Sequence, residues 1–209
     1  MIMKYIYTLV SVLLTFTFVN AQEQRVIKED FDSNRLRWDE FYEKDYYGGI
    51  QDGFFVLQNK KDGFVSWSVT DFPIDIDNNF NITFKFLVPR LSDKYYFGII
   101  FDYEDENNYR SFRVSEKRYK IVNTVNGISS LSRQGSIILT SGRNKEVIID
   151  MEKKGNKLLF NVDNMEAVEI TIPRTRSLNS NSFGFLVEDA NTIKVDEVII
   201  SQIVRDDNE

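Results

Sequence analysis

The stretch Phe80-Asn-Ile-Thr-Phe-Lys-Phe-Leu-Val88 alternates large apolar side chains with mostly polar ones. Successive side chains of a β-strand point to opposite faces, so this period of two places Phe80, Ile82, Phe84 and Phe86 on one face. Such a strand is half buried, and its apolar face belongs to the core. The stretch therefore predicts a sheet protein with this strand as one of its central elements.

The next apolar run, Tyr95 to Asp102, is apolar on both faces around Gly98. A strand without a polar face is expected in a sheet that is covered on both sides. The acidic, Asn-rich segment Glu104 to Asn108 supplies a turn. Strands over Tyr109 to Val114 and Tyr119 to Val125 follow, so this region predicts the middle strands of a β-sandwich.

Turn signals divide the rest of the chain into short strands. Asn126-Gly127 is typical of a two-residue hairpin turn, Lys145 to Met151 is in phase to pair with Leu158 to Val162, and Asp45 to Gly49 is interpreted as a turn. We expect about a dozen strands and no helix after the first residues. The predicted fold class is all-β, a two-sheet antiparallel jelly-roll sandwich.

Residues 1–21 have the pattern of an export signal. Lys4 stands in a short basic start, Leu9 to Val19 is largely apolar, and Ala21 suits a signal peptidase. The alternative is a membrane anchor, but the apolar run is about half of the roughly 20 residues that span a bilayer. We expect cleavage after Ala21, a sandwich domain over 22–204, a charged tail over 205–209 and no membrane span in the mature chain. The predicted location is periplasmic, cell-surface or secreted.

The composition excludes several kinds of site. The chain has no Cys and no His, which rules out disulfides, a cysteine nucleophile, a Ser-His-Asp triad and a His-ligated zinc. Its formal net charge of −6 disfavours nucleic acid or an anionic membrane as a partner. A neutral partner is expected instead.

Four features, in chain order, resemble one family. They are Glu29-Asp-Phe31 followed by Trp38, the strand Gly53 to Val56, the run Tyr96 to Phe101 followed by Asn107 to Phe112, and Phe183-Gly-Phe185 followed by Val195 to Val198. Together they are similar to the concanavalin A-like lectin and glucanase superfamily, in particular to its laminin-G-like members and to members of unknown function in exported bacterial proteins. The resemblance covers nearly all of Gln24 to Ile203. It implies a jelly roll whose concave face holds a saccharide in many members.

The catalytic motif of the β-glucan-cleaving members of this family is absent. Those enzymes carry Glu-x-Asp-x-x-Glu on one strand, whereas the nearest match, Glu43-Lys-Asp45, has Gly48 in place of the second Glu. A retaining glycosidase needs two carboxyl groups about 5 Å apart. We therefore predict no catalytic residues and no enzyme activity, while catalysis by carboxylates from separate strands is left open.

The candidate ligand-binding residues come from the central strands and one earlier strand. An aromatic ring can pack on the apolar face of a sugar ring, and Arg or Asp can hydrogen-bond sugar hydroxyls. The alternative for each aromatic residue is ordinary packing in the core of the sandwich. The candidates are Trp67, Tyr95, Tyr96, Asp102, Tyr109, Arg110, Arg113 and Tyr119.

A structural calcium ion is the one cofactor considered. The resemblance implies a site that joins an acidic residue of the first strand, Glu29 or Asp30, to Asp196 in the last strand. Calcium takes about six to eight oxygen ligands, so backbone carbonyls must complete the shell. Two other acidic segments, Asp75 to Asn79 and Asp102 to Asn108, lack the EF-hand pattern and are interpreted as solvated loops.

Three functions remain open from the sequence. The first is an exported, non-catalytic binding module for a neutral glycan, such as a cell-surface polysaccharide. The second is a glycoside hydrolase or lyase, which would show two carboxyl groups converging in a cleft. The third is a protein-interaction domain, which is favoured if large side chains fill the concave face.

Overall fold

The computed structural model describes residues 23–140, 142–163, 165, 168–172 and 178–204. The predicted export signal and charged tail lie outside these residues. The described residues form 15 strands and contain no helix. Accordingly, no helix in this part of the chain is long and apolar enough to cross a membrane.

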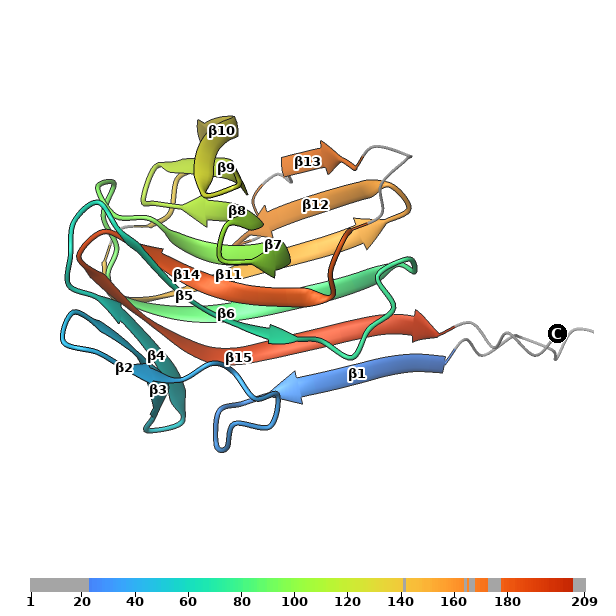
Figure 1. Cartoon of the computed structure of the whole chain (residues 1–209), viewed down its shortest axis with the longest axis horizontal. Helices are drawn as coiled ribbons and strands as arrows, with labels where there is room; N and C mark the ends of the chain where they lie inside the picture. Colours follow the sequence, from blue (N-terminus) through green and yellow to red (C-terminus); the bar gives the residue numbers. More distant parts are fainter. Residues whose placement is uncertain (1–22, 141, 164, 166–167, 173–177, 205–209) are drawn as a thin grey trace, which may run out of the picture.

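Two antiparallel sheets pack face to face as a sandwich (Figure 1). The nine-stranded sheet has the order β13-β12-β11-β6-β15-β4-β3-β2, with β1 paired to β15. Its strands are β1 (Glu23–Glu29), β2 (Phe41–Tyr42), β3 (Tyr46–Gln51), β4 (Phe54–Asn59), β6 (Phe80–Arg90), β11 (Arg143–Lys154), β12 (Lys157–Val162), β13 (Val168–Thr171) and β15 (Asn191–Val204).

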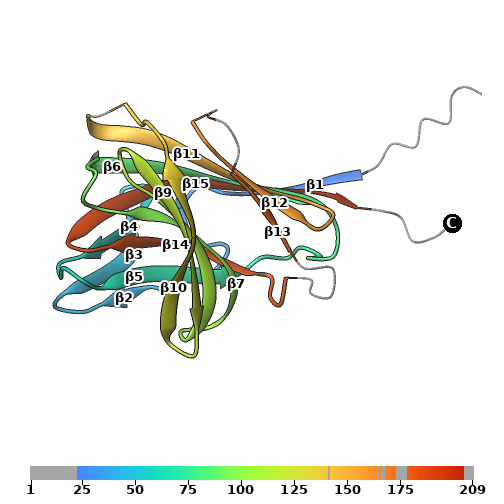
Figure 2. The same ribbon diagram turned by 90° about the horizontal axis from the view of Figure 1, so that it is seen from above.

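The six-stranded sheet has the order β10-β9-β8-β7-β14-β5. Its strands are β5 (Val65–Asp71), β7 (Phe97–Asp105), β8 (Asn108–Val114), β9 (Arg118–Val125), β10 (Ile128–Ser136) and β14 (Ser182–Glu188). Figure 2 shows β5, β7 and β14 in one layer and β6, β11 and β15 in the other. The predicted two-sheet, all-β architecture is confirmed.

The core lies between the two sheets and is rich in phenylalanine. Side chains of β6 alternate between buried and half-buried along the strand, as the period-two pattern predicted. Phe84 lies opposite Ile149 of β11 and Val198 of β15, and all three side chains are fully buried. Strand β6 is thus a central strand of the larger sheet.

Strand β7 is buried on both faces, also as predicted. Ile99 belongs to the main core, whereas Ile100 belongs to a second cluster with Val69, Tyr109 and Leu186. Because neighbouring side chains of a strand point to opposite faces, this second cluster lies on the face of the smaller sheet that is turned away from the larger one. We call this face the outer face.

One expected turn is wrong and another is shorter than expected. The segment Asp45 to Gly49 was expected to turn, but Tyr46 to Gln51 form β3. Its glycines serve close packing, since a Cβ added at Gly48 would lie 2.6 Å from Phe41 Cε1 of β2. The turn expected from Glu104 to Asn108 is also shorter, because β7 continues to Asp105 and β8 begins at Asn108.

Candidate functional site

A bulge in β7 organises the site. Phe101 pairs with Arg110 and Asp105 pairs with Asn108, so three residues of β7, Asp102 to Glu104, face only Tyr109 on β8. Asp102 at the bulge has a φ of 55°, in the left-handed region that Asp tolerates better than most residues. A bulge of this kind changes the direction in which side chains leave the strand.

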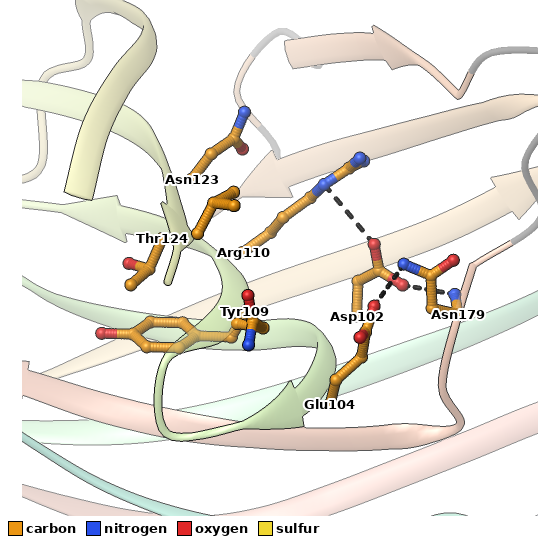
Figure 3. A pocket seen from close by; sticks show the side chains of 9 residues that line it. Asp102, Glu104, Tyr109, Arg110, Asn123, Thr124 and Asn179 are labelled. Carbon is orange, nitrogen blue, oxygen red and sulfur yellow. Dashed lines mark hydrogen bonds and ion pairs between the residues drawn. The ribbon is translucent and has the colours of Figure 1, made fainter. Parts of the chain in front are cut away.

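A pocket of about 330 Å³ opens beside the bulge (Figure 3). We call it the polar pocket. Its lining residues are Asp102, Glu104, Asn108, Tyr109, Arg110, Asn123, Thr124, Val125 and Asn179. The pocket thus contains three residues expected from the sequence: Asp102, Tyr109 and Arg110.

Hydrogen bonds and an ion pair hold the polar groups of this pocket in place. The Asn179 backbone N–H donates to Asp102 Oδ1, and the Asn179 side-chain amide donates to Glu104 Oε1. Arg110 Nε lies 3.4 Å from Asp102 Oδ2. In Figure 3 the side chains of Arg110 and Asp102 point toward each other, while the Tyr109 ring extends away from them.

The polar pocket presents both donors and acceptors of hydrogen bonds. Carboxylates accept, the Arg110 guanidinium donates, and an Asn amide does both. Within the described part of the chain, the Asn123 amide makes no hydrogen bond to another side chain, so it is available to a ligand. A ligand that carries several hydroxyl groups matches this set of partners.

Three aromatic residues, Trp67, Tyr109 and Tyr103, form an aromatic strip on the outer face. The Tyr109 ring centroid lies 5.7 Å from that of Trp67 and 6.2 Å from that of Tyr103. Trp67 and Tyr103 are half-buried, whereas Tyr109 is only 6% exposed. Tyr109 therefore also serves as core packing over this face, in agreement with the alternative considered for each aromatic candidate.

A second pocket of about 450 Å³, which we call the edge pocket, lies along β5. Its lining residues are Leu36, Arg37, Asp39, Val69, Thr70, Asp71, Tyr103 and Ser182. Two side chains of β5 hold the loop between β1 and β2 against the strand. Ser68 Oγ donates to the Asp39 carbonyl at 2.9 Å, and Thr70 Oγ1 donates to the Leu36 carbonyl.

The edge pocket contains two carboxylates, Asp39 and Asp71, and the charge of Asp71 acts on Asp39. Partial burial raises the pKa of Asp39 above its ordinary value, and the negative charge of Asp71 raises it further. The Ser182 hydroxyl donates a hydrogen bond to Asp71. Burial also raises the pKa of Tyr103, and a hydrogen bond from Trp67 opposes this effect.

An ionic cluster formed by Arg113, Lys120 and Glu188 lies on the same sheet. Glu188 Oε2 is 3.2 Å from Arg113 Nη1 and 2.8 Å from Lys120 Nζ. Burial raises the pKa of Glu188, but the two cations outweigh this effect and hold the pKa below its ordinary value. Lys120 Nζ also lies 3.9 Å from the centroid of the Tyr96 ring. The candidate Arg113 thus belongs to this cluster, and the candidate Tyr96 contacts it through Lys120.

The other two aromatic candidates lie elsewhere. Tyr95 contacts Lys94, whose Nζ is 4.8 Å from its ring centroid. The Tyr119 ring packs against the main core, 6.0 Å from the Phe112 ring, and lines an apolar pocket with Phe112 and Phe160. Tyr119 therefore has the packing role that was its alternative.

The three metal candidates each have a protein partner. Glu29 is fully buried and accepts hydrogen bonds from the backbone N–H groups of Phe31 and Leu36. Asp30 pairs with Arg35 at 2.6 Å, and Asp196 pairs with Lys85 at 3.0 Å. No group of three or more acidic side chains in the described residues can hold a metal ion.

Strand pairing nevertheless brings the two chain ends together. Glu29 of β1 lies opposite Val198 of β15, so the first and last strands are neighbours, as the calcium hypothesis required. Calcium binding itself stays a prediction.

Sequence reasoning missed the whole edge pocket and part of the polar pocket. Glu104 and Asn108 were noted only as members of an acidic loop, while Asn123, Thr124 and Asn179 had no recognisable signal. Asn123 and Thr124 sit in an ordinary strand, and Asn179 lies in a polar loop. Asn123 and Thr124 reach the site because β9 pairs with β8, and Asn179 reaches it because its backbone N–H bonds to Asp102 at the bulge.

Comparison with known proteins identifies the fold alone. No protein family profile matches the chain, and no curated protein sequence matches it. Among solved structures, it resembles the Emp47p carbohydrate recognition domain with a TM-score of 0.62 at 12% identity, covering 88% of this chain and 99% of that one. A protein of unknown function with a galectin-like fold from Bacillus subtilis gives a TM-score of 0.60 at 12% identity, covering 86% and 96%.

A third similar structure is an enzyme, xylan β-1,4-xylosidase from Bacillus halodurans C-125. The TM-score is 0.58 at 14% identity, covering 84% of this chain. This chain spans only 39% of the xylosidase. At such low identities the comparisons show the fold and do not show an activity. The fold is the concanavalin A-like β-sandwich that the sequence resembled.

Proposed function

We propose that this protein is an exported, non-catalytic module that binds a neutral glycan in the polar pocket. The observation that carries the proposal is the convergence of Asp102, Glu104, Arg110 and three Asn residues in one pocket at the bulge of β7. Sugar hydroxyls both donate and accept hydrogen bonds, which suits this mixture. The likeness to a carbohydrate recognition domain supports the same function.

A screen of the purified protein against immobilised neutral polysaccharides tests this proposal. The variant Asn123→Ala removes an amide that lines the polar pocket, and we expect its affinity to fall by roughly 2- to 10-fold, the range for one net hydrogen bond. The matched control is Asn161→Ala on β12 of the other sheet, which is also half-buried and should bind normally. Equal affinities of the two variants would place the ligand elsewhere.

One observation favours a second function, glycoside hydrolysis. Asp39 and Asp71 share the edge pocket, and the raised pKa of Asp39 is the property that a general acid needs. Release of reducing ends from a neutral polysaccharide, abolished in Asp39→Asn, would identify an enzyme. Binding without such release supports the non-catalytic module.

The protein-interaction alternative is favoured if large side chains fill the concave face of the sandwich. On the outer face of the smaller sheet, Trp67, Tyr103 and Tyr109 lie close together, and the edge pocket adjoins Tyr103. A ligand with the shape of a chain suits such a surface as well as a protein partner does. Negative results over all polysaccharides would favour the protein partner.

A further inference from the structure

We propose that the apolar pocket beside Tyr119 binds the hydrocarbon tail of a medium-chain fatty carboxylate, whose carboxylate group is held by Arg133. This site goes beyond the proposed glycan function, and its described lining shares no residue with the polar pocket or the edge pocket. The apolar pocket has a volume of about 330 Å³. Its lining residues are Phe112, Tyr119, Ser136, Ile137, Ile138, Phe160, Val162, Met165 and Val168.

The apolar pocket lies between the two sheets at one edge of the sandwich. Strands β10 and β13 are edge strands of the smaller and the larger sheet, and both are drawn at the top of Figure 1. The lining comes from β8 and β9 of one sheet, from β12 and β13 of the other, and from the segment that follows β10. Phe112 and Phe160 form its inner wall, since both are fully buried and their ring centroids are 4.7 Å apart.

The lining selects a hydrocarbon ligand. Among its described residues none is charged, and the only side-chain hydroxyls are those of Tyr119 and Ser136. An apolar cavity of about 150 Å³ stays dry and admits benzene. The volume of about 330 Å³ is roughly twice as large, so it has room for a longer hydrocarbon group. Because protein cores are close-packed, an apolar pocket of this size gains packing contacts when such a group fills it.

The rim of the pocket is open to a ligand. Ile138 is 80% exposed and Ser136 is also exposed, whereas Ile137 between them is buried. The Ile137 backbone N–H donates to the Lys117 carbonyl at 2.9 Å, which fixes this segment against the start of β9. A hydrocarbon tail that enters the pocket would cover part of Ile138, and burial of apolar surface favours binding.

Arg133 crosses between the two sheets beside this pocket. It lies opposite Ile121, whose side chain belongs to the main core, so its own side chain leaves β10 toward the larger sheet. Arg133 Nη1 donates to the backbone carbonyl of Glu169 on β13 at 2.5 Å. Glu169 directly follows Val168 of the pocket lining. The Glu169 carboxylate pairs with Lys157 at 2.9 Å instead.

The Arg133 guanidinium has donors left for a ligand anion. It carries five N–H groups, and the bond to Glu169 uses one of its nitrogens. Within the described part of the chain, no carboxylate forms an ion pair with Arg133, and its side chain is exposed. A planar guanidinium binds a carboxylate through two parallel hydrogen bonds. The net charge of −6 opposes a multiply charged head group, so the single charge of a carboxylate fits better than a phosphomonoester.

Calorimetric titration of the whole protein with octanoate tests the inference. The comparison ligands are octanol, which has the same tail without a charge, and butyrate, which has the head group on a short tail. We expect octanoate to bind about tenfold more tightly than octanol, the effect of one exposed charge-assisted contact. Butyrate should not bind measurably, because it buries too little hydrocarbon.

Two variants with matched controls locate the head group and the tail. Arg133→Gln should weaken octanoate binding about tenfold and leave octanol binding unchanged, whereas Arg143→Gln, at another exposed arginine outside the pocket, should change neither. Ser136→Trp places a large ring at the rim and should abolish binding of both ligands. Ser132→Trp, at an exposed position of the same strand outside the pocket, should not.

Each result decides one part of the inference. Equal affinity of the wild type for octanoate and octanol would overturn the role of Arg133. Normal octanoate binding by Ser136→Trp would overturn the assignment of the tail to the apolar pocket. Failure of the wild type to bind octanoate would overturn the whole inference. All four variants change exposed side chains, so their circular dichroism spectra should match that of the wild type.

Discussion

Replacing Glu188 by Gln should destabilise the protein measurably, because it leaves a buried arginine without its counter-ion. The Arg113 side chain is only 4% exposed, and Glu188 and Lys120 are 21% and 20% exposed. Arg113 Nε also donates to Ser111 Oγ at 2.9 Å, which fixes the guanidinium in place. The variant retains the shape of the side chain and removes only its charge.

The magnitude follows from the burial of the three side chains. Removing one partner of a fully buried ion pair costs about 3–5 kcal/mol, and exposed pairs contribute about 0–1 kcal/mol. One buried and two mostly buried partners place the expected loss between these limits, at about 2 kcal/mol. For a domain of 150–250 residues this corresponds to a fall of about 4–8 °C in the melting temperature.

The assay is urea and thermal unfolding at neutral and acidic pH. Because the folded-state pKa of Glu188 lies below its ordinary value, its charge stabilises the fold above the unfolded pKa of about 4.3. This stabilisation is lost as the pH falls through the lower folded-state pKa. The difference between wild type and Glu188→Gln should therefore shrink below about pH 4.

The matched control is Asp93→Asn, which breaks an ion pair of similar length. Arg118 Nη2 lies 3.1 Å from Asp93 Oδ2, but the two side chains are 57% and 37% exposed. Water screens such a pair, so the control should unfold almost as the wild type does. Equal effects of Glu188→Gln and Asp93→Asn would refute the argument from burial.

Four other outcomes are expected. Gly98→Ala should yield little folded protein by circular dichroism, since its Cβ would lie 2.0 Å from a backbone carbonyl oxygen of β8, whereas Gly142→Ala, with no atom within 4 Å, should fold normally. Phe160→Ala should lower the unfolding free energy in urea by about 3–5 kcal/mol, because its fully buried ring leaves a cavity; a loss below about 1 kcal/mol would contradict the packing described. A structural calcium ion at Glu29, Asp30 and Asp196 should raise the thermal midpoint in calcium over that in chelator, and Asp196→Ala should remove the rise; equal midpoints would leave these carboxylates to their protein partners alone. N-terminal sequencing of exported protein should begin at Gln22, and a start at Met1 would exclude cleavage.

Much of the fold could be predicted because its signals are local. The alternation over Phe80 to Val88 reports burial directly, and Asn126-Gly127 adopts the positive φ values that a tight hairpin requires. The sequence predicted a turn at Gly48 and Gly49, but a glycine also permits close packing against a neighbouring side chain. Whether a glycine turns the chain or admits a neighbouring ring depends on the partner strand, which is not visible in the sequence.

The site was predictable only where its residues are close in the sequence. Asp102, Tyr109 and Arg110 belong to one hairpin, so their proximity follows from the turn between them. The edge pocket needs Asp71 beside Ser182, which are 111 residues apart and meet because β5 pairs with β14. Such proximity is set by the order of strands in the sheet and has no local signature.

The bulge in β7 makes the linings of the two pockets depend on chain length at one point. The turn at Glu106 and Asn107 and the pair of Asp105 with Asn108 lie beyond the bulge, so they can persist if one residue between Phe101 and Asp105 is deleted. The deletion would change the side from which side chains between these two pairs emerge, because strand faces alternate residue by residue. The linings of the polar pocket and the edge pocket, which receive Asp102, Tyr103 and Glu104 between them, would then both change. In this hairpin, a single-residue deletion is therefore expected to alter the pocket linings more than most substitutions.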